Sequence, residues 1–277
     1  MRLVAVGDIA CDPDSPYLHR PGQCRHRDVG RLVRRMVSRG AEWFLTLGDA
    51  QYEDGTYRAF RDQFDPAFGA VRDVTKAVAG NHEYETEAAR GHFRYWGRRA
   101  GTPRQPWRTF TPVAGWRVVL LDSNCHQVGG CGPHSPQGRW LRDVLDSNAR
   151  PCTLAVWHHP LRSSGEYAGS EATRRKARPL WKLSATGGVD LVLNGHDHIY
   201  ERFAKRGDVQ QFTVGTGGKN HYDITTRAAG SQQRYGHHYG VLRLDLSSDG
   251  TYEHAFVTID GQVLDRGRTT CSNQPVP

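Results

Sequence analysis

Five short apolar runs are spread along the chain, and each has the length of a buried strand. They cover residues 3–6, 43–47, 76–79, 153–157 and 189–193. Runs of four to eight apolar residues indicate inner strands of a largely parallel sheet, because such strands are buried on both faces. The pattern therefore predicts five buried strands.

Helical periodicity marks three further segments. Apolar residues recur at helical spacing from Val29 to Val37, where Asp28 can cap the helix and Gly40 can end it. Residues 137–148 have a second apolar helical face, and residues 53–75 carry aromatic residues at the same spacing. We expect these aromatic side chains to pack against the sheet; they are Tyr57, Phe60, Phe64 and Phe68.

Two pairs of runs have the pattern of antiparallel hairpins. Residues 239–246 and 252–259 flank the turn Ser248-Asp249-Gly250, and residues 108–112 and 116–121 are joined at Ala114-Gly115. Between residue 86 and about residue 107 the pattern is irregular, so we expect no regular element there.

Each of the five apolar runs is followed within three residues by Asp, Asn or His. Because ligands bind at the carboxyl ends of parallel strands, we expect these side chains along one sheet edge: Asp8, Asp49, Asn81, His158, His196 and His198. Imidazole and carboxylate together suit Zn, Fe, Mn or Ni, and the lack of cysteine argues against a closed structural zinc site. Tyr52, three residues after Asp49, is a seventh candidate. Seven ligands suit a metal pair that shares one carboxylate.

The order of these motifs resembles that of the calcineurin-like metallophosphoesterases, and within them the purple acid phosphatase branch and its bacterial relatives. The motifs are Asp8, Gly48-Asp49, Gly80-Asn81-His82, His158 and Gly195-His196-Asp197-His198. Most family members have a histidine two residues after the first aspartate, where this chain has Ala10, whereas the purple branch has a tyrosine at the position of Tyr52. The resemblance spans residues 3 to about 260 and implies an α/β fold, a four-layer αββα sandwich with helices flanking two facing mixed β-sheets.

The resemblance also implies how two metal ions would divide the ligands. One ion would be held by Asp8, Asp49, Tyr52 and His198. The other would be held by Asp49, Asn81, His158 and His196, so that Asp49 bridges the pair. His158 is preferred to His159 because the family ligand lies two residues before the proline, here Pro160, although a swap stays open.

The implied function is the hydrolysis of phosphate monoesters by direct attack of a metal-bound hydroxide, as in an acid phosphatase. The Tyr52 phenolate would favour Fe(III), so we expect Fe(III) with Zn, Fe or Mn, and Zn–Zn or Mn–Mn as the alternative. Two other functions stay open: a phosphodiesterase or nucleotidase on the same centre, and a metal- or phosphate-binding protein without turnover.

Residues next to the ligands are candidates for acid–base and supporting roles. His82 is expected to hydrogen-bond a phosphoryl oxygen or to protonate the leaving group, and His159 is a second candidate proton donor. Glu201 and Arg202 are expected to pair with each other or to orient His198. Mammalian and plant relatives often have a further catalytic histidine in the loop at residues 163–167, which we expect to be flexible, and this chain has none there.

Six cysteines, none at a proposed ligand position, indicate disulfides and therefore an exported protein. Cys11–Cys24 and Cys125–Cys131 would close small loops and Cys152–Cys271 would be long-range, although the sequence leaves other pairings open. Free thiols in a cytosolic protein are the alternative. No signal peptide pattern precedes the first strand run, so a secreted protein would have lost its signal. His19 and His26, in the loop expected at residues 10–27, are expected at the surface.

The net charge of +8 changes the expected partners little. Basic residues are scattered, apart from Arg174-Arg175-Lys176, which we expect to form one solvated helix turn. We therefore expect a small phosphorylated substrate, no specific nucleic-acid partner, no membrane association and a monomer. The length predicts one domain, residues 1–265, followed by a tail, residues 266–277, held by Cys271.

Overall fold

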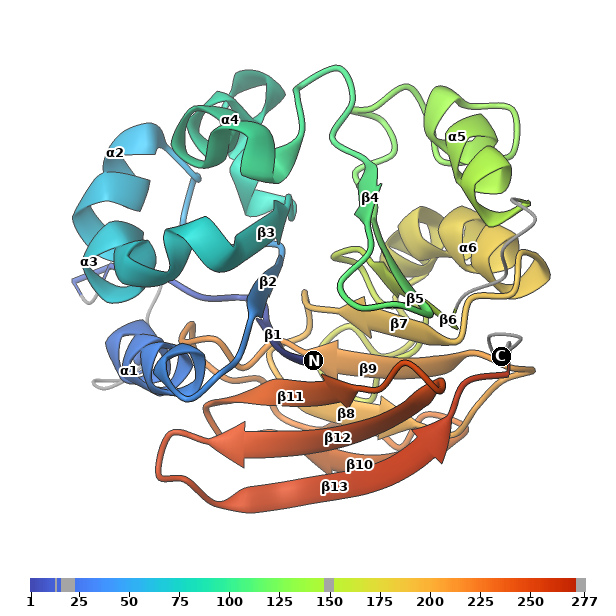
Figure 1. Cartoon of the computed structure of the whole chain (residues 1–277). Helices are drawn as coiled ribbons and strands as arrows, with labels where there is room; N and C mark the ends of the chain where they lie inside the picture. Colours follow the sequence, from blue (N-terminus) through green and yellow to red (C-terminus); the bar gives the residue numbers. More distant parts are fainter. Residues whose placement is uncertain (13, 16–22, 147–151, 273–277) are drawn as a thin grey trace.

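The computed structural model describes residues 1–277 except 13, 16–22, 147–151 and 273–277. Two β-sheets face each other and helices cover their outer sides (Figure 1). The first sheet has the order β13-β12-β11-β1-β2-β3. Its strands are β1 (Arg2–Val6), β2 (Trp43–Leu47), β3 (Thr75–Val78), β11 (Gly240–Leu246), β12 (Thr251–Thr258) and β13 (Val263–Thr270).

The second sheet has the order β10-β8-β9-β7-β6-β5-β4. Its strands are β4 (Arg108–Phe110), β5 (Trp116–Leu120), β6 (Cys152–Val156), β7 (Leu191–Asn194), β8 (Tyr200–Phe203), β9 (Gln210–Val214) and β10 (Ser231–Tyr235). The five predicted strands are β1, β2, β3, β6 and β7, and both predicted hairpins, β4–β5 and β11–β12, are antiparallel. The predicted sandwich of two mixed sheets is confirmed.

Helices α1 to α4 lie beside the first sheet, and α5 and α6 lie beside the second (Figure 1). Their bounds are α1 (His26–Ser38), α2 (Tyr57–Ala59), α3 (Asp65–Phe68), α4 (Arg90–Trp96), α5 (Pro136–Leu145) and α6 (Glu171–Thr186). The π-helical segment η1 (Phe60–Phe64) and the 3-10 segment η2 (Gly69–Val74) connect α2 and α3 to β3. Phe68 stacks on Phe44 of β2 at 5.7 Å, as expected for aromatic residues that pack against the sheet.

The main hydrophobic core fills the space between the two sheets and extends to the helices beside the first sheet, and a smaller core lies between the second sheet and α5 and α6. Strand β6 contributes to both, because successive side chains of a strand point to opposite faces. Leu154 and Val156 pack in the main core, whereas Ala155 packs in the smaller one. Burial on both faces explains why β6 has a continuous apolar run.

Four expectations about the fold are wrong. The predicted ligands do not share one sheet edge, because β1, β2 and β3 belong to the first sheet and β6 and β7 to the second. The segment expected to be irregular contains α4. Helix α1 begins at His26, so Asp28 lies in its first turn and pairs with Arg25 and Arg31 instead of capping the helix. The proposed boundary at residue 265 falls inside β13, which pairs with β12.

The three disulfides are Cys11–Cys24, Cys125–Cys131 and Cys152–Cys271, the pairings favoured from the sequence. Cys152 begins β6 and Cys271 follows β13, so this bond ties the two sheets together. Among the described helices, none is both long and apolar enough to span a bilayer.

Candidate metal centre

The predicted ligands lie at turns that follow five strands of the two sheets. Three of these residues have left-handed backbone conformations, with φ of 60° at Asp8, 46° at Asp49 and 71° at His196. Such conformations are uncommon for residues that carry a Cβ, and they cluster at functional sites. Gly80 permits the close approach of two of the turns, because a Cβ there would lie 2.1 Å from Asp49 Oδ1.

Three of the predicted ligand atoms lie around a fourth, the hydroxyl oxygen of Tyr52. Tyr52 Oη lies 2.9 Å from Asp8 Oδ1, 3.1 Å from Asp49 Oδ2 and 3.0 Å from His198 Nε2. His198 Nε2 is also 3.5 Å from Asp8 Oδ1. These are the four residues expected to hold the first metal ion, and we call them the tyrosine cluster.

The other predicted ligands lie close to Asp49 and to one another. His158 Nε2 lies 3.1 Å from Asp49 Oδ2, and His196 Nδ1 lies 3.0 Å from Asn81 Oδ1. One potential ligand atom from each of Asp49, His158 and His196 lies within 4.8 Å of the other two. We call Asp49, Asn81, His158 and His196 the histidine cluster. The same oxygen, Asp49 Oδ2, therefore contacts both clusters.

Backbone carbonyls orient two of the histidines. His158 Nδ1 donates to Leu47 O at 2.9 Å, and His198 Nδ1 donates to Asn220 O at 2.6 Å. A carbonyl only accepts, so Nδ1 must carry the proton and Nε2 of the neutral ring keeps its lone pair. Both Nε2 atoms point into the clusters. A neutral ring with its proton on Nδ1 is the tautomer that a metal ligand needs, because the lone pair is then on Nε2.

Glu83 supports the turns that carry the ligands, and the sequence analysis did not identify it. Its carboxylate accepts hydrogen bonds from the backbone N–H groups of Asp49 (3.0 Å), Ala50 (2.8 Å) and Gly80 (2.6 Å). Burial, followed by the neighbouring Asp49 carboxylate, raises the pKa of Glu83 to about 7. Its position directly after Gly80-Asn81-His82 was the available signal.

The donor set fits metal ions. Asp8 and Asp49 are 0% and 2% exposed, and neither forms an ion pair with Lys or Arg within the described part of the chain. Buried carboxylates need a compensating charge. Burial, followed by Asp49 and Asp8, raises the pKa of Tyr52, so the protein alone keeps this phenol protonated. A bound cation would compensate the carboxylates and favour the phenolate.

A family model described as calcineurin-like phosphoesterase matches residues 1–200. The chain belongs to this family. It is 28% identical to mouse tartrate-resistant acid phosphatase type 5 over 246 residues, which cover 78% of this chain and 72% of the relative. It is 27% identical to purple acid phosphatase 21 of Arabidopsis thaliana over 208 residues, which cover 68% of this chain and 46% of the relative.

The structure of a purple acid phosphatase from yellow lupin is similar in fold, with a TM-score of 0.78 and 17% identity. The match covers 97% of this chain and 53% of the lupin chain, so this chain spans about half the length of that protein. The family match and the acid phosphatase relatives identify the chain as a purple acid phosphatase-like phosphoesterase, which is a hydrolase.

His82 and His159, the two candidate proton donors, have different surroundings in this phosphoesterase. His82 Nδ1 donates to Glu53 O, and its Nε2 has no hydrogen-bond partner among the described residues. His159 is fully buried: its Nδ1 lies 2.8 Å from Ser123 Oγ and its Nε2 lies 3.0 Å from Lys176 Nζ. Since an ammonium group only donates, His159 Nε2 is an acceptor and Nδ1 carries the proton. Both ring nitrogens of His159 are thus occupied within the protein.

Glu201 and Arg202 do not pair with each other, because neighbouring residues on β8 face opposite sides. Arg202 pairs with Asp265 of β13, with Nε to Oδ2 at 2.7 Å. Glu201 accepts from the backbone N–H of Ser164 at 2.8 Å. The group that orients His198 is the Asn220 carbonyl.

The segment 163–167 is anchored rather than flexible. Asp197, the middle residue of the Gly-His-x-His motif, accepts from the backbone N–H groups of Glu166 (3.1 Å) and Tyr167 (3.2 Å). The Tyr167 ring consequently stacks on His196 at 4.1 Å. Tyr222 stacks in the same way on His198 at 4.0 Å. Neither tyrosine is among the residues predicted for the site, because no motif marks side chains that contact the ligands by stacking.

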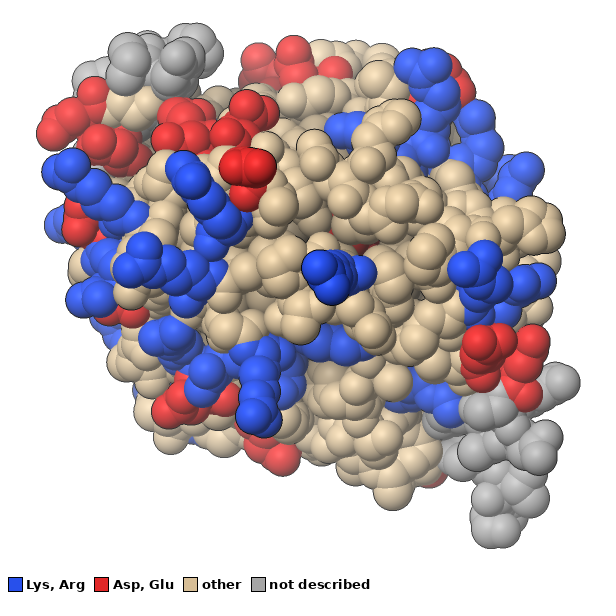
Figure 2. All heavy atoms as spheres, turned by 90° about the horizontal axis from the view of Figure 1, so that it is seen from above, with Lys and Arg blue, Asp and Glu red and all other residues tan. Residues whose placement is uncertain are grey.

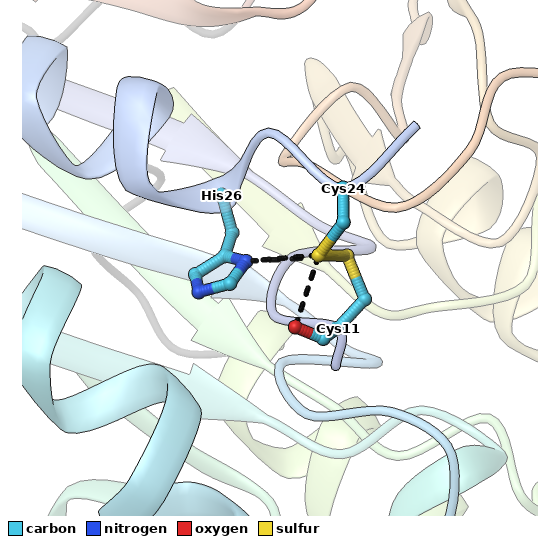
Figure 3. A group of neighbouring side chains, drawn as sticks. All are labelled: Cys11, Cys24 and His26. Carbon is cyan, nitrogen blue, oxygen red and sulfur yellow. Dashed lines mark hydrogen bonds between the residues drawn. A yellow bond between two sulfur atoms is a disulfide. The ribbon is translucent and has the colours of Figure 1, made fainter. Parts of the chain in front are cut away.

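A second group with metal-binding residue types is a disulfide with a neighbouring histidine (Figure 3). His26 Nδ1 lies 3.3 Å from Cys24 Sγ, which is bonded to Cys11. Thiolates are the metal ligands among sulfur groups, so the disulfide does not offer that site. The expectation that His26 lies at the surface is wrong, since it is 1% exposed. His19 lies outside the described residues.

Charged side chains are unevenly distributed over the face seen in Figure 2. Acidic side chains gather near one corner, whereas basic side chains are dispersed over several parts of this face.

Proposed function

We propose that this phosphoesterase hydrolyses phosphate monoesters at a centre of two metal ions. The observation that carries the proposal is the position of Asp49 Oδ2, 3.1 Å from Tyr52 Oη and 3.1 Å from His158 Nε2. One oxygen between two sets of ligand atoms is what a bridging carboxylate requires.

The tyrosine cluster would hold one ion and the histidine cluster the other. Two ions there would lower the pKa of a bound water and neutralise the phosphoryl oxygens of the substrate. A hard anionic phenolate supports Fe(III) in the tyrosine cluster, with Zn, Fe or Mn in the histidine cluster. Zn–Zn and Mn–Mn are the alternative pairs.

His82 is the proposed proton donor to the leaving group. Its Nδ1 proton is engaged by Glu53 O, so a donated proton would have to sit on Nε2 of the doubly protonated ring. Burial alone would lower the pKa of His82, but the Asp49 carboxylate and the Glu53 carbonyl raise it on balance.

Lys176 is the proposed cationic contact for a phosphoryl oxygen. It extends from α6 to His159, whose ring lies 4.4 Å from that of His196. A positive charge thus lies beside the histidine cluster, in a chain without the further histidine of many relatives. In this arrangement His159 positions Lys176. The role of His159 as a second proton donor stays a prediction.

The protein is proposed to work outside the cytoplasm. Three disulfides tie the described chain together, and such bonds persist in oxidising compartments.

The test is hydrolysis of p-nitrophenyl phosphate in ¹⁸O-labelled water, compared with bis(p-nitrophenyl) phosphate. We expect faster turnover of the monoester and one labelled oxygen in the phosphate released in a single turnover. A phosphorylated residue trapped on the protein would contradict direct attack by water. Preference for the diester would favour the phosphodiesterase alternative.

A further inference from the structure

A cavity of about 480 Å³ beside α6 is lined mainly by basic side chains. We call it the basic pocket, and its cations are Arg162, Arg174, Arg178, Lys182 and Arg206. None of these five belongs to either ligand cluster. Ala228 and Ala229 line the pocket with short side chains, which leaves room between the cations.

Helix α6 concentrates positive charge on one face. Arg174, Arg178 and Lys182 are four residues apart, so they follow one another along the helix, and like charges at this spacing are destabilising. The expectation of one solvated basic turn is therefore only partly correct. Arg175 is exposed, but Arg174 lines the pocket and Lys176 extends to His159.

Arg162 lines one wall of the pocket, and its guanidinium group packs against two aromatic rings. Its guanidinium carbon lies 4.5 Å from the centre of the Phe203 ring and 5.3 Å from that of Trp181. The Nη2 atom of Arg162 is buried and has no hydrogen-bond partner among the described residues. Leaving a buried charged donor unpaired costs free energy unless a ligand satisfies it.

The pocket has few negative groups to balance its cations. Arg178 pairs with Glu171 at 3.0 Å. For Arg174, Lys182 and Arg206, the described residues provide no ion pair. Burial, followed by repulsion from Arg206, lowers the pKa of Arg162 to about 10. The cations that line the pocket thus outnumber the negative groups that pair with them.

We propose that the basic pocket binds a phosphate group, either as free phosphate or as a phosphoryl group carried by a larger molecule. Guanidinium groups match the oxygens of phosphate in paired hydrogen bonds, and several cations around one cavity suit a dianion better than a monoanion. The site is separate from the metal centre and does not depend on the proposed reaction.

The test is calorimetric titration of the metal-loaded protein with inorganic phosphate. The pocket variant is Arg174→Gln with Arg206→Gln, and the matched control is Arg175→Gln with Lys205→Gln, which removes the same charge from exposed neighbours outside the pocket. We expect the pocket variant to weaken one phosphate-binding event about tenfold or more, because each lost charged hydrogen bond contributes that much. The control should keep wild-type affinity, and both should keep the kcat/KM for p-nitrophenyl phosphate.

An Asp49→Ala variant separates this site from the metal centre. If the pocket exists, this variant still binds phosphate, and adding the two pocket substitutions weakens that binding by the same factor as in the metal-loaded protein. Equal phosphate affinity in the pocket variant and its control would overturn the proposal, whatever the activity of the metal centre. A parallel titration with tripolyphosphate distinguishes the sources. If tripolyphosphate binds more tightly than phosphate and the pocket variant loses this difference, the ligand is a larger phosphorylated molecule. Equal affinity for tripolyphosphate and phosphate indicates free phosphate.

Discussion

Asp49 Oδ2 lies at the contact between the tyrosine and histidine clusters, and the surrounding residues fix its position. The backbone N–H of Asp49 donates to the Glu83 carboxylate. The other carboxylate oxygen of Asp49, Oδ1, accepts from the backbone N–H of His82 at 2.9 Å. Because Oδ1 is engaged, Oδ2 is the oxygen available to both clusters. At the scale of single residues, hydrogen bonds within the protein thus orient the proposed bridging carboxylate.

Tyr52 distinguishes this chain from family members that have a histidine at the position of Ala10. If Tyr52 binds Fe(III), charge transfer from phenolate to iron should colour the iron-loaded protein pink to violet. Tyr52→Phe should lose the absorption band while the other three residues of the tyrosine cluster retain iron. Visible spectra and iron content of both proteins check this. A colourless wild type, or a coloured variant, would leave Tyr52 as a packing aromatic beside a zinc or manganese centre.

The seven ligand candidates could be identified from the sequence because each follows a strand within a short motif. Their helpers could not. Glu83 at least adjoins a motif, but Lys176 and Tyr222 act through distances set by the packing of elements, and no local pattern encodes those distances. The assignment of Glu201 and Arg202 failed for a related reason, since Asp265 comes from a strand more than sixty residues later.

At the scale of elements, the strands with continuous apolar runs were predictable, whereas the edge strands β10 and β13 were not. Strand β10 has the sequence Ser-Gln-Gln-Arg-Tyr and lies at the edge of its sheet, where little of it is buried. Strand β13 is also an edge strand with several exposed positions. Half-exposed edges carry a weak hydrophobic pattern, so sequence periodicity misses them.

Helix α4 was missed because tertiary packing, rather than periodicity, stabilises it. It has seven residues and includes a glycine. Its Tyr95 ring stacks on Phe60 at 4.8 Å, and its Trp96 ring lies 5.2 Å from that of Phe64. These contacts join segments more than thirty residues apart, which a local pattern cannot reveal.

At the scale of the whole molecule, buried histidines should limit stability in acid. Burial lowers the pKa of His26 to about 4 and those of His92 and His221 to about 3. These groups bind protons more readily when the chain is unfolded, where their pKa is near 6.5. The neutral histidines therefore contribute their full stabilisation of the folded state above the unfolded-state pKa. This stabilisation is lost as the pH falls toward the pKa values of the folded state.

We expect the free energy of unfolding to fall between pH 7.5 and pH 5, by up to about 1.4 kcal/mol per pH unit for each such histidine. Urea unfolding at both pH values measures this. His92→Gln should reduce the pH dependence, whereas the exposed control His134→Gln should leave it unchanged. A His92→Gln protein with the wild-type pH dependence would show that His92 does not contribute.

The measurement that tests the central claim most directly is the metal content of the protein purified without chelator, beside that of Asp49→Ala. The proposed bridging carboxylate predicts two transition-metal ions per wild-type chain and the loss of both in the variant, with the circular dichroism spectrum unchanged. One ion per chain, or none, in a wild-type protein with full phosphatase activity would contradict the binuclear centre.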